Sequence, residues 1–353
     1  MDTLTHALSG ALFARATAAC DTEPGAIPCW QRIAVGAAAA AFPDVDFVAS
    51  FVSPLFWILH HRGVTHSIVL LPAWALLLAW LAALVLRHPR GWRAYYAVAA
   101  LGLGTHIAGD LITSFGTMIF APLSDVRIAW GTAFIIDLWF SGMIVAGLAL
   151  SAAWKRSSAP ALIASAALVG YVAFQGLLHA QAVEFGTQHA RAEGIAGAKV
   201  SVQPGPASPF NWVVVLEKDG EYRYALVNLL RREIAAEAGP ESGFLAHLSA
   251  PFNPVSEALW SRASLFGYIP EDASLAREAW NQAEFGFFRW FAQYPALYRV
   301  DRGNPSLCVW FRDLRFSRPG AANTSFRYGM CHEPAQSWRR YQIIGDDARV
   351  ALD

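Results

Sequence analysis

The sequence is poor in charge, and this shortage excludes several classes of protein. Only 15% of its 353 residues are Asp, Glu, Lys or Arg, whereas 55% are hydrophobic, which is too apolar for an ordinary soluble protein. The formal net charge is +0, so the chain lacks the basic face with which a nucleic-acid-binding protein contacts phosphates. We therefore expect a membrane protein without a nucleic acid partner.

Cysteine and the familiar catalytic motifs are scarce as well. The four cysteines, Cys20, Cys29, Cys308 and Cys331, lack the spacing of a zinc ribbon, so we do not expect cysteine to bind a metal. Cys20 and Cys29 fall in a short predicted loop. Cys308 and Cys331 are expected to pair if their half of the chain lies in an oxidising compartment. That half also shows no nucleophile elbow, phosphate loop or dinucleotide fingerprint, which excludes the enzyme classes marked by those motifs.

Charge is distributed unevenly along the chain. Residues 1–180 carry nine Lys or Arg and eight Asp or Glu, whereas residues 181–353 carry eighteen and nineteen. We therefore predict a mainly α membrane domain over residues 1–180 and a soluble α+β domain with a small sheet over residues 181–353. In the second domain we predict strands at 199–203, 212–217, 221–229, 309–316 and 325–330, and helices at 257–264 and 274–291. Asp219-Gly220 provides a hairpin turn.

The first domain contains apolar runs that favour a polytopic helical membrane domain of about five transmembrane helices. These runs are residues 4–19, 64–86, 94–110, 132–153 and 160–178. The first run lacks the basic start and cleavage site of a signal peptide, so we expect it to be retained. Residues 31–42 are shorter and predict a half-helix that stops at Pro43.

The basic residues predict the orientation of these helices. Arg87, Arg90 and Arg93 lie between two predicted spans, Lys155 and Arg156 lie between two others, and Arg15 and Arg32 flank the first loop. The positive-inside rule assigns all three loops to the cytoplasm. The histidines and aspartates discussed next then gather on the outer side, and the second domain becomes extracytoplasmic.

Histidine and aspartate recur within this apolar half. Ionisable groups in hydrophobic spans are costly and persist mainly where they meet one another, water or an ion. We predict that the metal ligands are His6, Asp44, His61, His66, His106 and Asp110. Imidazole and carboxylate without thiolate suit zinc, with manganese or iron(II) as alternatives. Six ligands exceed one tetrahedral ion, so the cofactor is one or two divalent ions, zinc first and manganese second.

Each candidate ligand has a simpler interpretation. His106 and Asp110 are spaced i, i+4 and share one helical face, but they could also form a buried hydrogen bond that joins two helices. Asp44 and Asp46 repel each other unless a cation or a proton lies between them, although Asp46 could instead cap a helix. The sequence leaves open which of His61 and His66 ligates.

Three further residues are candidates for catalysis. Asp46 or Asp137 would act as a base or orient the attacking water, and Arg62 would hold a phosphate bidentately. The alternatives are an interfacial anchor or a salt bridge to Asp46 for Arg62. For Asp137 they are metal ligation, contact with a histidine N–H, or pairing with Arg127. His60 is expected to be a bystander.

Four motifs in order carry a family resemblance: residues 1–6 (MDTLTH), 42–46 (FPDVD), 61–67 (HRGVTHS) and 105–110 (THIAGD). Residues 1–180 resemble the membrane-bound metal-dependent hydrolase family, which is YdjM-like and associated with LexA regulation. The order of ligands is also similar to zinc-dependent phospholipase C and the P1-type nucleases. The latter likeness implies that His6 and Asp110 serve one ion, that Asp44, one of His61 or His66, His106 and Asp110 serve another, and that Asp110 bridges them.

These observations predict a multi-pass metal-dependent hydrolase of the bacterial inner membrane. Its substrate is expected to be a phosphoester of a membrane lipid or lipid-linked compound, cleaved by metal-activated water. The alternative is a non-enzymatic, metal-stabilised membrane regulator that binds a partner. A metal transporter ranks last, because the middles of spans 64–86 and 160–178 lack acidic groups and histidines.

Overall fold

The computed structural model describes residues 1–18, 26–235, 239, 241–303, 306–317, 325–333 and 336–352. They form two compact units, which we treat separately. The first comprises residues 1–49, 60–180 and 204–209, and the second comprises residues 50–59, 181–203 and 210–353. Cys20, which we placed in the first loop, lies outside the described residues.

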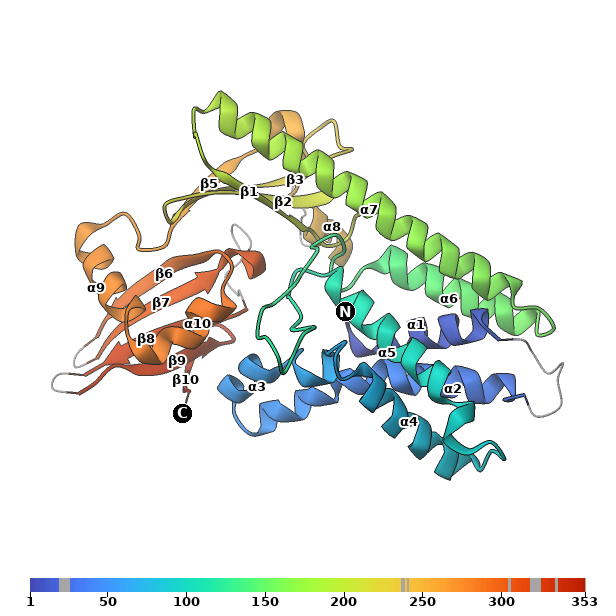
Figure 1. The fold of residues 1–353 in the computed structure, drawn as a ribbon. Coiled ribbons are helices and arrows are strands. Elements are labelled where there is room, and N and C mark those ends of the chain that lie inside the picture. The colour runs from blue at the N-terminus through green and yellow to red at the C-terminus, as the bar shows by residue number, and fades with distance from the viewer. Residues whose placement is uncertain are drawn as a thin grey trace. The chain divides into compact units, whose positions relative to one another are not determined.

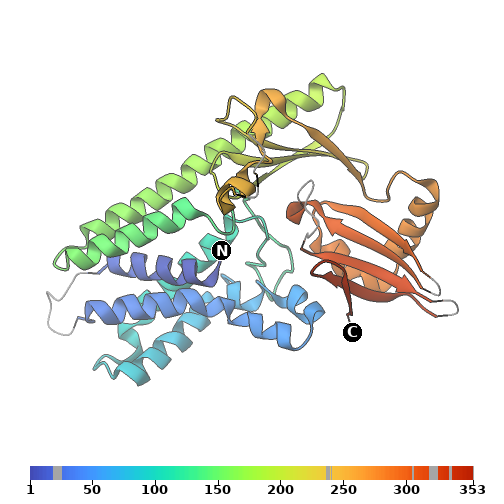
Figure 2. The same cartoon turned by 180° about the vertical axis from the view of Figure 1, so that it is seen from behind.

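The first unit is helical (Figure 1). Its elements are α1 (Thr3–Ala16), α2 (Cys29–Ala41), the 3-10 helix η1 (Phe42–Phe51), the 3-10 turn η2 (Val64–His66), α4 (Leu71–Leu86), η3 (Gly91–Ala94), α5 (Tyr96–Leu111), α6 (Leu138–Ala153) and the first part of α7 (Ala159–Ala192). Figures 1 and 2 both show α6 and α7 side by side, and Gly147 of α6 lies directly against Ala164 of α7.

Glycines set the distance between α1, α2 and α5. A Cβ atom on Gly10 of α1 would lie 2.3 Å from the carbonyl oxygen of Gly36 on α2, and one on Gly102 of α5 would lie 2.6 Å from the same oxygen. Small residues let apolar helices approach backbone to backbone in this way. His6 lies one turn before Gly10 and His106 one turn after Gly102. The glycine contacts therefore bring the two histidines together.

The helices bear out a membrane protein, but fewer of them than predicted are long enough to cross a bilayer. Among the described residues, Cys29–Phe51 and Ala159–Ala192 have the length and apolarity of a span, and Pro54–His66 with Leu71–Leu86 would count as a third, bent by 79°. Helix α1 has 14 residues and α5 and α6 have 16 each. At about 1.5 Å per residue they are shorter than a bilayer core of about 30 Å.

The predicted half-helix at residues 31–42 was too short. Pro43 does end the α-helical pattern, because proline has no N–H to donate. The chain nevertheless continues as the 3-10 helix η1 to Phe51, and this extension places Asp44 and Asp46 on a helical segment.

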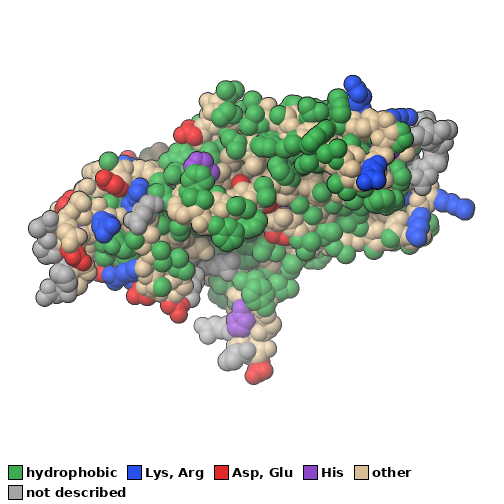
Figure 3. All heavy atoms as spheres, turned by 90° about the horizontal axis from the view of Figure 1, so that it is seen from below, with side chains coloured by type: hydrophobic (Ala, Val, Ile, Leu, Met, Phe, Trp, Pro, Cys, Tyr) green, Lys and Arg blue, Asp and Glu red, His purple; other side chains and the backbone are tan. Residues whose placement is uncertain are grey.

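The outer surface of the helical unit is apolar, as contact with lipid requires. Large side chains stay exposed on α4 and α7, including Val85 at 78% and Ile163 at 69%. Figure 3 shows hydrophobic side chains over most of the visible helical surface, with Lys and Arg side chains collected at one end. This surface differs from that of a soluble bundle, which would bury such residues.

The second unit contains α3 (Pro54–His60) and two five-stranded sheets, and not the small sheet that we predicted. The first sheet has the order β1-β2-β3-β4, with β5 also paired to β3, and the second has the order β10-β9-β8-β7-β6. The strands are β1 (Lys199–Pro204), β2 (Asn211–Lys218), β3 (Glu221–Asn228), β4 (Asn253–Pro254), β5 (Trp260–Ser264), β6 (Pro295–Arg302), β7 (Leu307–Asp313), β8 (Arg327–His332), β9 (Arg339–Ile344) and β10 (Ala348–Ala351).

The predicted β2–β3 hairpin is confirmed, with Asp219 at φ 52° and Gly220 at φ 79° in its turn. The helix predicted at 257–264 is wrong, because residues 260–264 pair with β3 as strand β5. A short 3-10 turn, η4 (Val255–Glu257), precedes this strand. The helix predicted at 274–291 is divided into α9 (Pro270–Trp280), η5 (Ala283–Phe285) and α10 (Gly286–Phe291). The remaining elements are α8 (Phe244–Ser249) and η6 (Leu314–Phe316).

Aromatic packing and a disulfide hold the second sheet. Trp280 of α9 packs on Phe311 of β7, with ring centroids 5.2 Å apart, and Phe288 of α10 packs on Tyr328 of β8 at 5.5 Å. Cys308 and Cys331 lie opposite each other on β7 and β8 and form a disulfide. The expected pairing of these cysteines is confirmed.

The glycine contacts predict a position-specific effect on stability. Gly102→Ala would push a methyl group into the backbone of α2, and overpacking of this kind costs about 1–3 kcal/mol. We expect a lower melting temperature in detergent, measured by the fluorescence of a thiol- or tryptophan-based unfolding assay. Gly104→Ala, on the same helix but with nothing within 4 Å of the added atom, is the matched control and should melt like the wild type. Equal melting of both variants would contradict the close-approach argument.

Candidate metal centre

The start of α1 is capped so that His6 faces α5. The carboxylate of Asp2 accepts hydrogen bonds from the backbone nitrogen of Thr5 at 3.0 Å and from its hydroxyl at 2.6 Å, which satisfies free N–H groups of the first turn. His6 is then 1% exposed, and its ring lies close to Gly109 of α5, where a Cβ atom would be 3.1 Å from the imidazole.

His106 presents an unprotonated Nε2 to the centre. Its Nδ1 lies 2.6 Å from the carbonyl oxygen of Ala40. Because a carbonyl can only accept, Nδ1 carries the proton, and in the neutral ring Nε2 is left with a lone pair. A histidine that binds a metal through one nitrogen is usually oriented by such a bond at the other.

His66 is oriented in the same way through Thr65. The Thr65 hydroxyl donates to the carboxylate of Asp46 at 3.3 Å and lies 3.0 Å from Nδ1 of His66. Since its proton is directed to the carboxylate, the hydroxyl accepts from Nδ1–H. In the neutral ring Nε2 of His66 is likewise left with a lone pair, and the side chain is completely buried.

Two carboxylates meet these two imidazoles. Nε2 of His66 lies 3.2 Å from Oδ2 of Asp110 and 3.6 Å from Oδ1 of Asp44, and Nε2 of His106 lies 3.5 and 3.6 Å from the same two oxygens. Neither Nε2 atom nor Oδ2 of Asp110 has a hydrogen-bond partner, although all three are buried. Four donors of lone pairs thus face one another, and a cation is the group that would make this arrangement favourable.

The spacing fits a metal ion. Ligands about 2.0–2.2 Å from one ion in a tetrahedron lie about 3.3–3.6 Å from each other, close to the four N···O distances of 3.2–3.6 Å between these imidazoles and carboxylates. The hydroxyl of Thr3 donates to the other oxygen of Asp44 at 2.7 Å and so directs Oδ1 to the centre. We call His66, His106, Asp44 and Asp110 the four-donor cluster.

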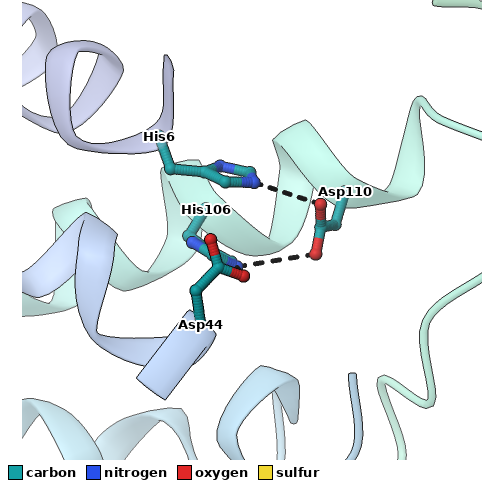
Figure 4. A group of neighbouring side chains, drawn as sticks. All are labelled: His6, Asp44, His106 and Asp110. Atoms are coloured by element: carbon teal, nitrogen blue, oxygen red, sulfur yellow. Dashed lines mark hydrogen bonds and ion pairs between the residues drawn. The ribbon is translucent and has the colours of Figure 1, made fainter. Parts of the chain in front are cut away.

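His6 lies beside this cluster and contacts the other oxygen of Asp110. Its Nε2 is 3.1 Å from Oδ1, and its ring stacks on that of His106 with centroids 3.7 Å apart. Figure 4 shows the two rings one above the other, with Asp110 beside both and one of its oxygens toward each ring, and Asp44 on the side of His106. One donor atom from each of these four residues lies within 4.8 Å of the others, so His6 belongs to the same group of polar side chains.

The structure separates the two histidines that the sequence left open. His66 enters the four-donor cluster, whereas Nδ1 of His61 lies 2.8 Å from Oδ1 of Asp46. Oδ2 of Asp46 accepts from the backbone nitrogen of Arg62 at 2.9 Å and lies 3.5 Å from Nδ1 of His66. Of the two histidines, the structure brings His66 to the cluster and pairs His61 with Asp46, so ligation by His61 stays a prediction, and Asp46 is positioned to hold both imidazoles.

Two of the predicted catalytic residues are bound elsewhere. Asp137 caps α6, accepting from the nitrogens of Trp139 and Phe140, and its second oxygen accepts from the hydroxyl of Tyr171 at 2.8 Å. The carboxylate is thus occupied as a helix cap. The guanidinium of Arg62 contacts Oδ1 of Asp110 at 2.9 Å and donates to Thr113 at 3.0 Å, so the predicted bidentate grip on a phosphate is not supported.

Sequence reasoning missed the partners that orient the ligands. Thr3 and Thr65 could have been found, because each lies in the same motif as a predicted ligand. Thr113 lies three residues after Asp110, just beyond the end of α5, and could have been found by spacing. The carbonyl group of Ala40 could not have been predicted as a partner of His106. Every residue has a backbone carbonyl, and only the packing of α2 on α5 brings this one to the imidazole.

The fold and the cluster define a helical membrane protein with a buried histidine–aspartate centre. Residues 1–182 match the YdjM inner membrane protein family, and the chain belongs to that family. It is 27% identical over 165 residues to YfhP of Bacillus subtilis (strain 168), an uncharacterized protein. The match covers 46% of this chain and 49% of YfhP, so the chain spans about half the length of that relative. No solved structure matches the chain.

The donor geometry predicts that His106 is needed for metal uptake. His106→Ala removes one of four donors. Loss of a residue that only hydrogen-bonds to a metal ligand lowers metal affinity ~10–100-fold, so we expect at least that loss here. Detergent-purified protein would be analysed by elemental mass spectrometry after dialysis into a metal buffer. His60→Ala, which removes an exposed imidazole, is the control and should keep the wild-type metal content. Equal metal content in all three proteins would contradict the cluster as a metal centre.

Proposed function

We propose that this chain is an integral membrane metal-dependent hydrolase that cleaves a phosphoester of a lipid or lipid-linked substrate. The observation that carries the proposal is the convergence of two imidazole lone pairs and two carboxylate oxygens within 3.2–3.6 Å in the interior of a membrane protein. A divalent ion held there supplies Lewis acidity toward a phosphoryl oxygen and lowers the pKa of the water that it binds.

The side of the cluster that faces η1 is the route for substrate. Asp44, Asp46 and His61 keep 11%, 9% and 16% of their side chains exposed, whereas His66 and Asp110 are fully buried. On η1 the neighbouring Val45 and Phe47 are 46% and 54% exposed. An accessible polar edge beside exposed apolar side chains suits a substrate with a phosphoryl head and an apolar tail.

Asp46 and His61 form the proton-handling pair of the proposed reaction. They are hydrogen-bonded to each other at the accessible edge, and Asp46 also reaches His66 through Thr65. Asp46 therefore positions a ligand, and His61 can pass a proton between solvent and the site. His66 and His106 are held in the tautomers that leave Nε2 directed at the ion.

A metal-locked structural protein is the second candidate, and the burial of the cluster favours it. Structural zinc sites use four protein ligands and are closed, whereas catalytic sites keep a position open. Two imidazoles and two carboxylates would close a tetrahedral zinc ion, while an octahedral ion such as Mn²⁺ keeps positions for water and substrate. Metal preference therefore distinguishes the two functions.

Turnover tests the proposal directly. Purified protein depleted of metal would be supplied with Mn²⁺ or Zn²⁺ and assayed for phosphate-ester cleavage on phospholipid in mixed micelles and on a chromogenic phosphodiester. We expect metal-dependent turnover that falls about 10–100-fold in Asp46→Asn, with Asp125→Asn at an exposed position as the control. Metal that raises the melting temperature without any turnover would instead identify the structural protein.

We further propose that the cluster and the second unit lie outside the cytoplasm. Helix α1 begins near the cluster and ends at the loop flanked by Arg15 and Arg32, and α5 starts after Arg93 and has Asp110 in its last turn. The basic residues and the cluster thus occupy opposite ends of these helices. The positive-inside rule assigns the basic ends to the cytoplasm.

The disulfide tests this orientation. Cys308 and Cys331 should resist alkylation in intact cells until a reductant is added, because oxidised pairs persist outside the cytoplasm. The measurement is a gel shift with a bulky maleimide before and after reduction. A chain that carries Cys308→Ser should expose Cys331 to a membrane-impermeant maleimide. If that maleimide labels Cys331 only after lysis, the orientation is reversed.

A further inference from the structure

The two oxygens of Asp110 have different surroundings. Oδ2 faces the two Nε2 atoms of the four-donor cluster, whereas Oδ1 is contacted by the guanidinium of Arg62 at 2.9 Å, by Nε2 of His6 at 3.1 Å and by the N-terminal amino group of Met1 at 2.5 Å. A bridging carboxylate in a two-metal site places one ion on each oxygen, with the ions about 3.5–4 Å apart. In this protein the positively charged side chain of Arg62 contacts the second oxygen, Oδ1 of Asp110.

Arg62 is fixed in this position. Its backbone has φ 61°, a left-handed conformation that is uncommon for a residue with a Cβ atom. The backbone nitrogen donates to Asp46 at 2.9 Å, and the backbone oxygen accepts from Met118 at 2.9 Å. The side chain is held by Thr113 and lies over the ring of Phe115, 4.9 Å from its centroid. With the residue only 2% exposed, the guanidinium has no solvent-facing place to which it can withdraw.

Charge then limits what Oδ1 can hold. A second divalent ion on this oxygen would be a close neighbour of the guanidinium, in a buried setting where like charges are poorly screened. The guanidinium also satisfies part of the charge of a carboxylate that is completely buried, a role that a second ion would otherwise fill.

We propose that Arg62 takes the place of a second metal ion, so that the centre binds one divalent ion and Arg62 supplies the second positive charge. This inference rests on the proposed metal centre, and it replaces the one or two ions expected from the sequence by one. Removal of the charge should open the Oδ1 side, where His6 and Asp110 would together ligate an additional ion.

Metal stoichiometry tests the proposal. Full-length protein in detergent would be depleted with a chelator, saturated with Mn²⁺ and analysed for metal per chain and by electron paramagnetic resonance. We expect about one ion in the wild type, with the spectrum of an isolated Mn²⁺, and about two in Arg62→Met, with the coupling of ions about 3.5–4 Å apart. Adding His6→Ala to Arg62→Met should return the ratio to about one, the four-donor site alone.

Arg127→Met is the matched control. The guanidinium of Arg127 lies over the same Phe115 ring at 4.7 Å, but it donates to the carbonyl oxygens of Phe115 and Gly116. This variant should keep the wild-type stoichiometry and spectrum.

The outcomes separate this inference from the proposed function. No bound metal in the wild type would overturn both. Two coupled ions in the wild type would overturn the role of Arg62 while leaving a metal-dependent hydrolase intact. A folded Arg62→Met protein that still saturates at one ion would also overturn it. If Arg62→Met does not fold, the wild-type ratio and spectrum decide alone.

Discussion

Two carboxylates and two imidazoles share a buried space, and the rest of the helical unit is arranged around that constraint. Asp110 and His66 are completely buried, and burying a charge without compensation is strongly unfavourable. Compensation comes from several elements at once: α1 contributes His6, the segment after α3 contributes Arg62, and η2 contributes His66. The centre therefore joins these elements electrostatically as well as through apolar packing.

Close helix packing makes this joining possible. In a membrane the hydrophobic effect gives little drive for helices to associate, and contact between small residues takes its place. Gly10, Gly36 and Gly102 allow α1, α2 and α5 to meet at their backbones, one helical turn from the histidines. The same approach brings the carbonyl of Ala40 to His106 and thereby fixes its tautomer. The close packing of these helices is therefore also what orients the imidazole of His106.

The position of the cluster at one end of the helices relates the chemistry to the membrane. The accessible edge formed by Asp44, Asp46 and His61 adjoins the exposed apolar residues of η1. Arg15 and Arg93 lie at the other ends of α1 and α5. In the proposed function, this edge is where a substrate would approach from the lipid surface.

Much of the site was predictable from local pattern, because the cost of an ionisable group in an apolar chain does not depend on knowing the fold. That cost selected His66, His106, Asp44 and Asp110 among six predicted ligands while leaving the choice between His61 and His66 open, and the turn at Asp219-Gly220 followed from its local backbone preference. Sequence did not reveal that His61 pairs with Asp46, that Asp137 caps α6, or that β5 is a strand. These depend on which neighbour each group meets in space. Arg62 is the clearest case: its charge was visible in the sequence, but only the folded chain places that charge on Oδ1 of Asp110.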